Sequence, residues 1–399
     1  MLKRIAAILA IMSTAIFSAG SSCSGGGSGA DCGKTPDGAA EIRAERFPDS
    51  FSISGTRLFG KLFKKGENTI ISPYSIGIAM DMAYCGARGE TAEEMARVLG
   101  LPEGTTPGGV MKGAKEVLGA IKSGDDVTIE TANSIWTRSG VKKKYASDCK
   151  RNFNAEVRNE VDADKINGWV SKSTHEKIKT IIDSADGIDT ALINAVYFNG
   201  VWAVPFKSDM TRKKDFTKSD GTKIKVDMMH GTMNVPYYED ENCKAVRLDY
   251  KGGYSMFVMV PKEGREAKAV PDSIEGIENL MTNYDVRVSI PKFKAEYKTE
   301  LKPTFESLGM KKAFSPGADF GAISEGLRIT SIIHKTFIDV SEKGTEAAAA
   351  TAVIMTKSMP PMGEQPKTFT ADRPFLFIIA DDTYGIPIFA GAVENPEYK

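Results

Sequence analysis

The chain has 399 residues and balances 52 lysines and arginines against 52 aspartates and glutamates, so its formal net charge at pH 7 is zero. Hydrophobic residues make up 41% of the sequence and charged residues 26%, as in an ordinary globular protein. This balance excludes the basic surface that nucleic-acid binders need, and the local basic run Lys142–Lys144 is interpreted as a solvated loop. Length alone would suggest two domains or more.

The first residues have the pattern of a targeting segment. Lys3 and Arg4 precede an apolar run from Ile5 to Phe17, and small residues then lead to Cys23. A charged start followed by a short apolar stretch is typical of a secretory signal, and the run is too short to span a bilayer. We therefore predict that residues 1–22 are a signal peptide and that the protein is exported.

Cys23 resembles the attachment cysteine of a bacterial lipoprotein, and the glycine- and serine-rich SGGGSG behind it is typical of a flexible tether. This resemblance predicts a lipid-anchored tether over residues 23–46, with membrane contact only through the lipid. Gly20 stands where a leucine is usual, so plain cleavage near Ala19, followed by secretion, is the alternative. The folded domain is expected over residues 47–399.

The other four cysteines are Cys32, Cys85, Cys149 and Cys243. Their spacing matches neither a metal site nor a compact disulfide framework. Cys32 lies in the tether, and Cys85 lies in an apolar helical run, where a buried free thiol is the default interpretation. We predict no structural disulfide.

The first half of the folded domain is predicted to be rich in helices. Ser72 and Pro73 form a strong helix start, with Ser72 as the cap and Pro73 in the first turn, and apolar residues follow along one face. Thr91, with Glu94 three residues later, has the pattern of a capping box for the next helix. We also expect a short helix over Val110–Ile121, a strand over Val127–Trp136 and an amphipathic helix over Ile166–Ile182.

Strands are predicted to dominate from Asp215 onward. The preceding segment Ala191–Phe198 is apolar without alternation, which is typical of a strand buried on both faces, whereas Val286–Tyr297 alternates cleanly. A helix is expected over Thr299–Leu308. The remaining strands are expected over Val246–Tyr250, Tyr254–Val260, Ile329–Val340, Phe375–Ala380 and Ile386–Val393. No repeat or linker follows the tether, so one large α+β domain is predicted.

The sequence lacks the common enzyme motifs: the G-x-S-x-G elbow, the phosphate-binding loop, H-E-x-x-H and C-x-x-C. Among its three histidines, His175 is interpreted as a surface residue because no second ligand follows at the next helical turn. His334 lies in an apolar strand and is interpreted as a hydrogen-bonded core histidine. We predict no catalytic residue, metal site or cofactor, and hence no enzyme.

The stretch Glu342–Pro361, EKGTEAAAATAVIMTKSMPP, is ambiguous by itself. Ala347–Ala350 favour a helix, Val353 and Ile354 favour a strand, and the two prolines end either one. With the period of a strand, one face carries only small or apolar residues: Thr345, Ala347, Ala349, Thr351, Val353 and Met355. The segment could therefore enter a sheet without burying a charge.

The segment HKTFIDVSEKGTEAAAATAVIM, which starts at His334, resembles the hinge and reactive loop of the serpins. Three further blocks resemble the same family in the same order. They are NTIISPYSIGIAMDMAYCGARGETAEEM from Asn68, LINAVYFNGVWAVPF from Leu192 and PFLFIIADDTYGIPIFAGAVENP from Pro374. The resemblance covers roughly Phe51 to Pro396, which is nearly the whole chain.

This resemblance implies a serpin fold of three β-sheets and about nine helices, with a reactive loop exposed above a large central sheet. Ser72, Ser75, Asn194 and His334 would form a polar cluster beneath that sheet, called the shutter. Trp202 and the ion pair of Lys292 with Glu342 would mark the breach, the end of the sheet where insertion begins. The hinge would comprise Glu342, Gly344, Thr345, Glu346, Ala347, Ala348, Ala349, Ala350 and Thr351.

The function implied by the resemblance is inhibition of serine endopeptidases, with cysteine endopeptidases as a second class, by a suicide-substrate mechanism. The target protease would cut the loop, form a covalent complex and be trapped when the loop inserts into the sheet. Counting from Gly344 by the family's usual hinge length places the scissile bond at Ser358–Met359. Lys357–Ser358 is the alternative, and Met359–Pro360 is disfavoured by the proline. The protein is expected to be a monomer that binds no nucleic acid.

A non-inhibitory serpin, acting as a binding or scaffold protein, is the alternative function. Such a protein would keep the fold and lose insertion, and a charge or a proline on the inward face of the hinge would mark it. That face carries neither. Thr345 is the first residue expected to face inward, whereas Glu346 is expected to face outward.

Overall fold

The computed structural model describes residues 57–121, 123–265, 280–345 and 365–398. The predicted signal peptide, the tether, Cys23 and Cys32 lie outside these residues. So do the hinge residues from Glu346 to Thr351 and the bond candidates Lys357, Ser358 and Met359. Within the described ranges the chain mixes helices with two hydrogen-bonded sheets, and the α+β expectation is confirmed.

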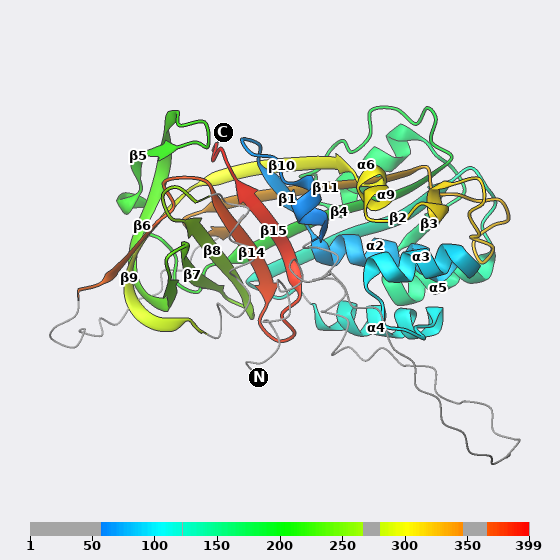
Figure 1. Cartoon of the computed structure of the whole chain (residues 1–399), viewed down its shortest axis with the longest axis horizontal. Coiled ribbons are helices and arrows are strands. Elements are labelled where there is room, and N and C mark those ends of the chain that lie inside the picture. Colours follow the sequence, from blue (N-terminus) through cyan, green and yellow to red (C-terminus); the bar gives the residue numbers. More distant parts are fainter. Residues whose placement is uncertain (1–56, 122, 266–279, 346–364, 399) are drawn as a thin grey trace, which may run out of the picture.

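The smaller sheet has six strands among the described residues and runs along the long axis of the molecule (Figure 1). In spatial order these are β10 (Phe293–Glu300), β11 (Ser331–Ser341), β12 (Gly344–Thr345), β4 (Thr190–Val201), β2 (Val127–Thr137) and β3 (Glu156–Arg158). Strands β11 and β4 also pair directly, in parallel, from Ser331 opposite Ala191 to Phe337 opposite Tyr197. This is the central sheet of the structure.

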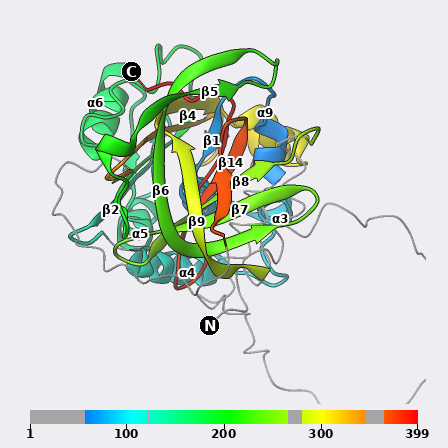
Figure 2. The same ribbon diagram turned by 90° about the vertical axis from the view of Figure 1, so that its left-hand side faces the viewer.

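The larger sheet has nine strands in the described part of the chain and wraps one end of the molecule (Figure 2). Its order is β1 (Thr69–Ile71), β15 (Pro387–Val393), β14 (Phe375–Asp381), β8 (Tyr254–Pro261), β7 (Cys243–Tyr250), β6 (Lys223–Glu239), β9 (Thr282–Pro291) and β13 (Lys367–Thr370), with β5 (Arg212–Thr217) on β6. The 17-residue strand β6 joins the β5 region to the β7 region without interruption. What the resemblance implies as two further sheets is therefore hydrogen-bonded here as one.

The helices gather mainly at the other end of the molecule (Figure 1). Seven α-helical segments occur in the described ranges, against about nine expected. They are residues 57–62, α2 (Pro73–Gly86), α3 (Gly89–Leu99), α4 (Pro107–Ala120), α5 (Lys143–Phe153), α6 (Ala163–Ser173) and α9 (Lys302–Ser307), and two short 3₁₀ turns lie at Ser208–Met210 and Lys312–Phe314. None of the described helices is long and apolar enough to cross a bilayer.

Helix α2 starts as predicted and is buried more completely than predicted. The Ser72 hydroxyl caps it by accepting from the Ser75 backbone N–H at 3.2 Å, and Pro73 occupies the first turn. All of its residues are buried, whereas the periodicity indicated one buried face. The difference arises because α2 contacts β4 and β2 of the central sheet, β15 of the larger sheet, and helices α3, α4 and α5.

Strand β4 is buried on both faces, as its unbroken apolar sequence predicts. Leu192, Val196 and Phe198 face the main core, which is shared with α2 and the larger sheet. Ala191, Ile193 and Ala195 alternate with them and face a second, smaller core. Ile166 and Val170 of α6 cover that second core, so α6 lies across the outer face of the central sheet.

Four local predictions are wrong in detail, each because a tertiary contact overrides a local pattern. The helix expected over Ile166–Ile182 ends at Ser173, and His175 and Glu176 adopt positive φ values of 49° and 62°. Ile178, Ile181 and Ile182 remain buried, so the apolar spacing continues after the helix has ended. The strand expected over Val286–Tyr297 is divided at Lys292 into β9 and β10, which belong to different sheets.

The capping box predicted from Thr91 and Glu94 does not form. Helix α3 already begins at Gly89, and the Thr91 hydroxyl accepts from the distant Asp319 N–H at 2.9 Å. The Glu94 carboxylate accepts from the N–H groups of Lys311 and Lys312, at 2.8 and 2.6 Å. The helix expected over Thr299–Leu308 is likewise shortened to α9, because Glu300 still belongs to β10.

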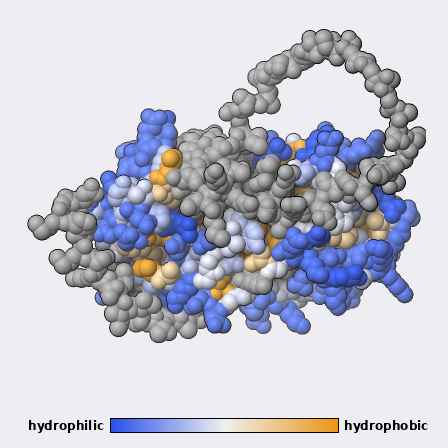
Figure 3. Space-filling model, turned by 90° about the horizontal axis from the view of Figure 1, so that it is seen from below, coloured by the Kyte–Doolittle hydropathy of each residue, from blue (hydrophilic) through white to orange (hydrophobic). Residues whose placement is uncertain are grey.

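Among the cysteines, Cys85, Cys149 and Cys243 are buried free thiols. Burial raises the pKa of the Cys85 thiol well above its ordinary value. Large hydrophobic side chains that are exposed in the described part of the chain are Met210, Leu280 and Tyr398. The face seen from below is accordingly hydrophilic over most of its described area, with small hydrophobic areas scattered between (Figure 3).

Candidate functional site

Strand β12 places the start of the hinge inside the central sheet. It pairs antiparallel with β11, Thr345 opposite Val340, and with β4, Thr345 opposite Gly200. The direct β11–β4 pairing ends at Phe337 and Tyr197, so the two strands diverge beyond this point and β12 fills the wedge between them. The Thr345 side chain is completely buried.

Glycine is required at the entry to this wedge. Gly344 has a φ of 145°, a conformation that residues with a side chain rarely adopt. A Cβ at this position would lie 2.0 Å from the carbonyl oxygen of Gly200 on β4. Only a residue without a side chain can therefore bring the hinge this close to the neighbouring strand.

Two aromatic side chains of the breach hold the buried hinge residue. The Tyr250 hydroxyl is hydrogen-bonded to the Thr345 hydroxyl at 2.7 Å, and its ring stacks on Trp202 with centroids 4.2 Å apart and planes 11° apart. Trp202 Nε1 donates to the carbonyl of Ser341 at 3.0 Å, and its backbone N–H donates to the carbonyl of Lys343, also at 3.0 Å. Trp202 thus binds the turn between β11 and β12, and Tyr250 binds Thr345 in β12.

The turn is also held by the ion pair of Lys292 with Glu342, whose charged atoms are 3.0 Å apart. The two side chains are only 18% and 12% exposed, so this is not a surface pair worth ~0–1 kcal/mol. The Thr211 hydroxyl donates to the same carboxylate at 2.8 Å. Burial acts to raise the pKa of Glu342, but hydrogen bonds from its own N–H, Lys292 and Thr211 outweigh it and hold that pKa below its ordinary value.

The shutter residues meet beneath the central sheet. His334 on β11 and Asn194 on β4 are directly opposite in the parallel register, and His334 Nδ1 is hydrogen-bonded to Asn194 Oδ1. His334 Nε2 accepts from the Ser72 N–H at 3.1 Å, so the ring proton lies on Nδ1. Asn194 Nδ2 donates to the Ser75 carbonyl at 2.8 Å and also contacts the Ser75 hydroxyl.

The buried environment keeps His334 neutral. It lowers the pKa of the imidazole from 6.5 to about 3, because a charged ring would be deprived of water. All four shutter side chains are buried. The cluster is therefore a set of neutral hydrogen bonds that bridges β4 and β11 and ties both strands to the start of α2.

Sequence reasoning missed three residues of this site. Asn133 on β2 accepts a hydrogen bond from Asn194, Tyr250 holds Thr345, and Thr211 supports Glu342. No sequence motif surrounds these three residues. Each contacts a partner far away in the chain, which only the sheet register or a tertiary turn brings close. For Asn133 a weak signal exists, since an asparagine within a strand buried at both ends needs a partner.

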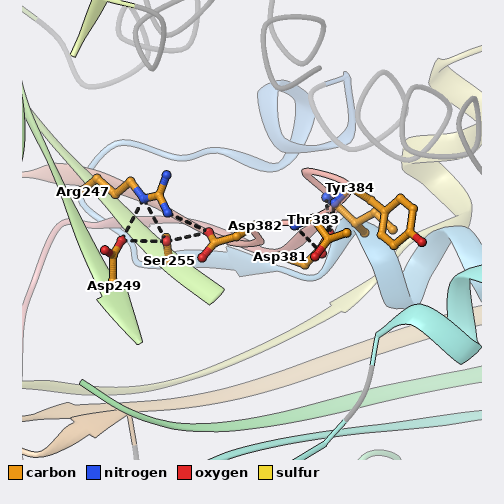
Figure 4. Close-up of polar contacts among 8 residues, drawn as sticks. Arg247, Asp249, Ser255, Asp381, Asp382, Thr383 and Tyr384 are labelled. Atoms are coloured by element: carbon orange, nitrogen blue, oxygen red, sulfur yellow. Dashed lines mark hydrogen bonds and ion pairs between the residues drawn. The ribbon is translucent and has the colours of Figure 1, made fainter. Parts of the chain in front are cut away.

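A second polar cluster lies next to Tyr250 in the chain, around Arg247, Asp249 and Ser255 (Figure 4). Arg247 Nε donates to Asp249 at 2.8 Å and to Ser255 at 3.0 Å, and Ser255 donates to Asp382 at 2.6 Å. Burial, with Asp249 and Asp381 nearby, raises the pKa of Asp382 despite hydrogen bonding from Ser255 and the charge of Arg247. The cluster joins the β7–β8 hairpin, which carries Tyr250, to the β14–β15 hairpin.

The backbone completes this link, because the Asp249 carbonyl accepts from the Ala203 N–H at 2.8 Å, next to Trp202. No group of histidine, cysteine and acidic side chains suited to a metal ion occurs in the described ranges. Polar and aromatic contacts thus hold β12 between β4 and β11.

His334 gives the stability of the fold a defined pH dependence. Between its folded pKa of about 3 and its ordinary value of 6.5, the unfolded chain binds a proton that the folded chain does not. The stability contribution is complete above the ordinary value and is lost as the pH falls, by up to about 1.4 kcal/mol per pH unit. We expect denaturant unfolding, measured between about pH 8 and pH 5, to show this slope.

The matched control is His334→Gln, which removes the titrating ring and should flatten the slope. Asp81 acts in the opposite direction, because burial raises its pKa well above the ordinary value and its contribution grows as the pH falls. Asp81 is present in both proteins, so the difference between their slopes isolates His334. Equal slopes would contradict the assignment.

Tyr250→Phe tests the contact that holds the hinge. The ring and its stack on Trp202 remain, but the buried Thr345 hydroxyl loses its partner, so we expect a loss of about 1–3 kcal/mol in the free energy of unfolding. Thr345→Val removes the other partner. The double variant should be less destabilised than the sum of the two single variants, because no hydroxyl is then left unpaired. Strict additivity would show that the hydrogen bond contributes nothing.

Comparisons with known proteins agree with this architecture. Residues 51–396 match the model of the family described as serpin (serine protease inhibitor). An uncharacterized serpin-like protein of Thermococcus kodakarensis is 38% identical over 360 residues, which cover 85% of this chain and 83% of that protein. Iripin-2 of Ixodes ricinus is 32% identical over 351 residues, which cover 82% of this chain and 88% of that protein.

The fold is similar to that of solved structures at comparable identity. The thermophilic serpin tengpin in its native state matches with a TM-score of 0.81 and 30% identity, covering 88% of this chain and 94% of tengpin. Serpin48 of the insect Tenebrio molitor matches with a TM-score of 0.79 and 31% identity, covering 89% of this chain and all of that structure. These matches confirm the serpin fold that the sequence resemblance implies, and the chain belongs to the serpin family.

Proposed function

We propose that the protein inhibits serine endopeptidases, with cysteine endopeptidases as a second class, as a suicide substrate whose reactive loop inserts into the central sheet. The observation that carries the proposal is the position of β12. Its two residues already lie between β4 and β11, antiparallel to both, in the geometry that a longer inserted strand would continue. The family's description as serine protease inhibitors supports the same function.

The proposed reaction begins with attack of the protease nucleophile on the carbonyl carbon of Ser358. The peptide bond to Met359 breaks, the new amino group of Met359 takes up a proton, and an ester or thioester joins Ser358 to the protease. The freed segment then extends β12 along the sheet and carries the attached protease with it. Loop insertion in serpins is a known example of strand addition to a sheet and of the release of stored strain.

Insertion requires β4 and β11 to part along their direct pairing. The His334–Asn194 hydrogen bond bridges these two strands at one register position, so it must break before the loop can pass. Asn194 already contacts Ser75 and Asn133, and His334 contacts Ser72. These contacts use Asn194 Nδ2 and His334 Nε2, so they hold both side chains in place while the strands separate. The His334 Nδ1 proton and Asn194 Oδ1 need new partners, at a cost of ~1–3 kcal/mol for each that stays unpaired.

The gain from insertion is large enough to drive the movement of a protease. A strand of about a dozen residues gains cross-strand contacts of ~0.2–1 kcal/mol each and ladder hydrogen bonds of ~0.5–1.5 kcal/mol each. The sum is on the order of 10 kcal/mol, comparable with the whole stability of a typical domain. The native state with an uncut loop is then metastable relative to the inserted state.

We further propose that the protein is exported and anchored to a membrane through a lipid on Cys23, as a monomer. The support is the charged and apolar start of the chain and the glycine-rich segment behind the cysteine. A lipid on Cys23 predicts incorporation of labelled palmitate by expressing cells, and loss of the label in Cys23→Ser. Label in neither protein, with the mature chain in the medium, would favour cleavage near Ala19.

Thr345→Arg tests the proposed inhibition at its first step. The variant would place a charge in the fully buried site beside Tyr250, at a cost of several kcal/mol. Insertion should stall while the loop around Ser358 stays accessible, so deacylation overtakes trapping. We expect the wild type to form SDS-stable complexes with a member of a serine-protease panel, and Thr345→Arg to be cleaved at the same bond and released.

Glu346→Arg is the matched control, because the period of a strand turns this side chain outward. It should retain most of the complex. Mass spectrometry of the released C-terminal peptide identifies the bond, which should leave Met359 as the new N-terminus. Equal loss of complex in both variants would contradict the expectation that Thr345 faces into the sheet and Glu346 faces outward. Cleavage of the wild type by every protease tested, without any stable complex, would favour the non-inhibitory alternative.

A further inference from the structure

The C-terminal segment Asn395–Tyr398, which we call the C-terminal strap, lies against the breach. The Lys294 N–H, near the start of β10, donates to the carbonyl of Glu397 at 2.8 Å. The Tyr398 ring lies 4.3 Å from the Lys292 ammonium and 5.4 Å from that of Lys294, measured to the ring centroid. Figure 1 shows the C-terminal end beside β10.

The strap is fixed at its other end by a single asparagine. Asn68 Oδ1 accepts from the N–H groups of Glu394 and Asn395, at 2.8 and 2.9 Å, and its Nδ2 donates to the Asn395 carbonyl at 2.9 Å. Asn68 directly precedes β1, which pairs with β15. The path of the chain beyond β15 is therefore determined by contacts at both ends of the strap.

The strap places an aromatic ring next to the hinge ion pair. The Lys292 ammonium lies 3.0 Å from the Glu342 carboxylate and 4.3 Å from the Tyr398 ring. A cation within about 6 Å of an aromatic face is attracted by the ring. Lys292 and Glu342 are themselves only 18% and 12% exposed, and such a partly desolvated setting strengthens the attraction between them.

Glu342 begins the turn that carries β12 into the sheet, so its partner controls the turn. The Glu342 carbonyl accepts from the Phe206 N–H at 2.9 Å, and Trp202 contacts Ser341 and Lys343 on either side of Glu342. A firmly held Lys292 therefore fixes the turn from one side while Trp202 fixes it from the other. Tyr398 therefore acts on the turn through Lys292, the partner of Glu342.

We propose that Tyr398 is a positioning residue for the hinge: the C-terminal strap holds Lys292 against Glu342 and thereby keeps Gly344 and Thr345 seated between β4 and β11. This role concerns the native state and needs no protease. Its consequence for inhibition, a hinge that is ready to insert, rests on the proposed function.

Hydrogen–deuterium exchange of the full chain tests the role directly, read on peptides that contain Gly344 and Thr345. Tyr398→Ala should raise the exchange rate of these two amides by roughly fivefold, the change that loss of an exposed cation–π contact implies. Tyr398→Phe keeps the ring and should restore protection to within about twofold of the wild type. Glu397→Ala is the matched control, because it shortens a neighbouring side chain of the strap, which accepts from the Asn395 amide at 2.9 Å, and leaves the Tyr398 ring in place.

Dependence on Lys292 separates positioning from a general loosening of the fold. In a Lys292→Met background the ring has no hinge cation to hold, so Tyr398→Ala should add no further exchange. Glu342→Gln serves as the second background if Lys292→Met fails to fold. Unchanged exchange in Tyr398→Ala, failure of Tyr398→Phe to restore protection, or a full effect in both backgrounds would each overturn the proposal. Because these measurements involve no protease, they are independent of whether the protein inhibits one.

Discussion

The structure depends on the incomplete pairing of two parallel strands. Strands β4 and β11 are hydrogen-bonded from Ala191 and Ser331 to Tyr197 and Phe337, and then separate by the width of one strand. Where they touch, the neutral pair of His334 and Asn194 bridges them from below. Where they separate, Gly344 and Thr345 occupy the gap. The other features of the site keep this arrangement in place at one end or the other.

The two ends are stabilised by different physical interactions. The shutter relies on uncharged hydrogen bonds in a fully buried setting, where a protonated imidazole would be strongly disfavoured. The breach relies on aromatic stacking between Trp202 and Tyr250 and on a largely buried ion pair. The shutter therefore joins its strands through neutral hydrogen bonds, whereas the breach fixes its geometry through the stack and the ion pair. In the proposed insertion the sheet would part at the shutter, while the turn at the breach stays fixed.

Much of the fold could be predicted from local sequence. The cap of Ser72 and Pro73, the strand Val127–Trp136 and the fully buried strand around Ala191–Phe198 follow from residues within a few positions of one another. Prediction failed where the partner was distant in the chain. Thr91 and Glu94 fit a capping box, yet they bind backbone groups more than two hundred positions away. Ile178 and Ile182 continue a helical period although the backbone has already turned at His175.

The same reason explains which site residues were found. Gly344, Thr345, His334 and Asn194 lie in blocks with a recognisable family pattern, whereas Tyr250, Thr211 and Tyr398 act through contacts that only the folded chain creates. Tyr250 is the last residue of an ordinary strand, β7, and precedes a turn at Gly252 and Gly253. Neither its burial nor its reach to Thr345 can be derived without the register of β7 against the breach.

Because β12 is already paired with both neighbouring strands, it changes which step limits the rate of any later insertion. Starting a new strand inside a sheet normally resembles nucleation: several backbone angles must be fixed, and two neighbours separated, before the first hydrogen bonds form. Here Gly344 and Thr345 already form those first pairs with both neighbours. What remains is propagation, in which each residue added gains its own contacts, so the rate should depend on how quickly β4 and β11 unzip ahead of the advancing strand.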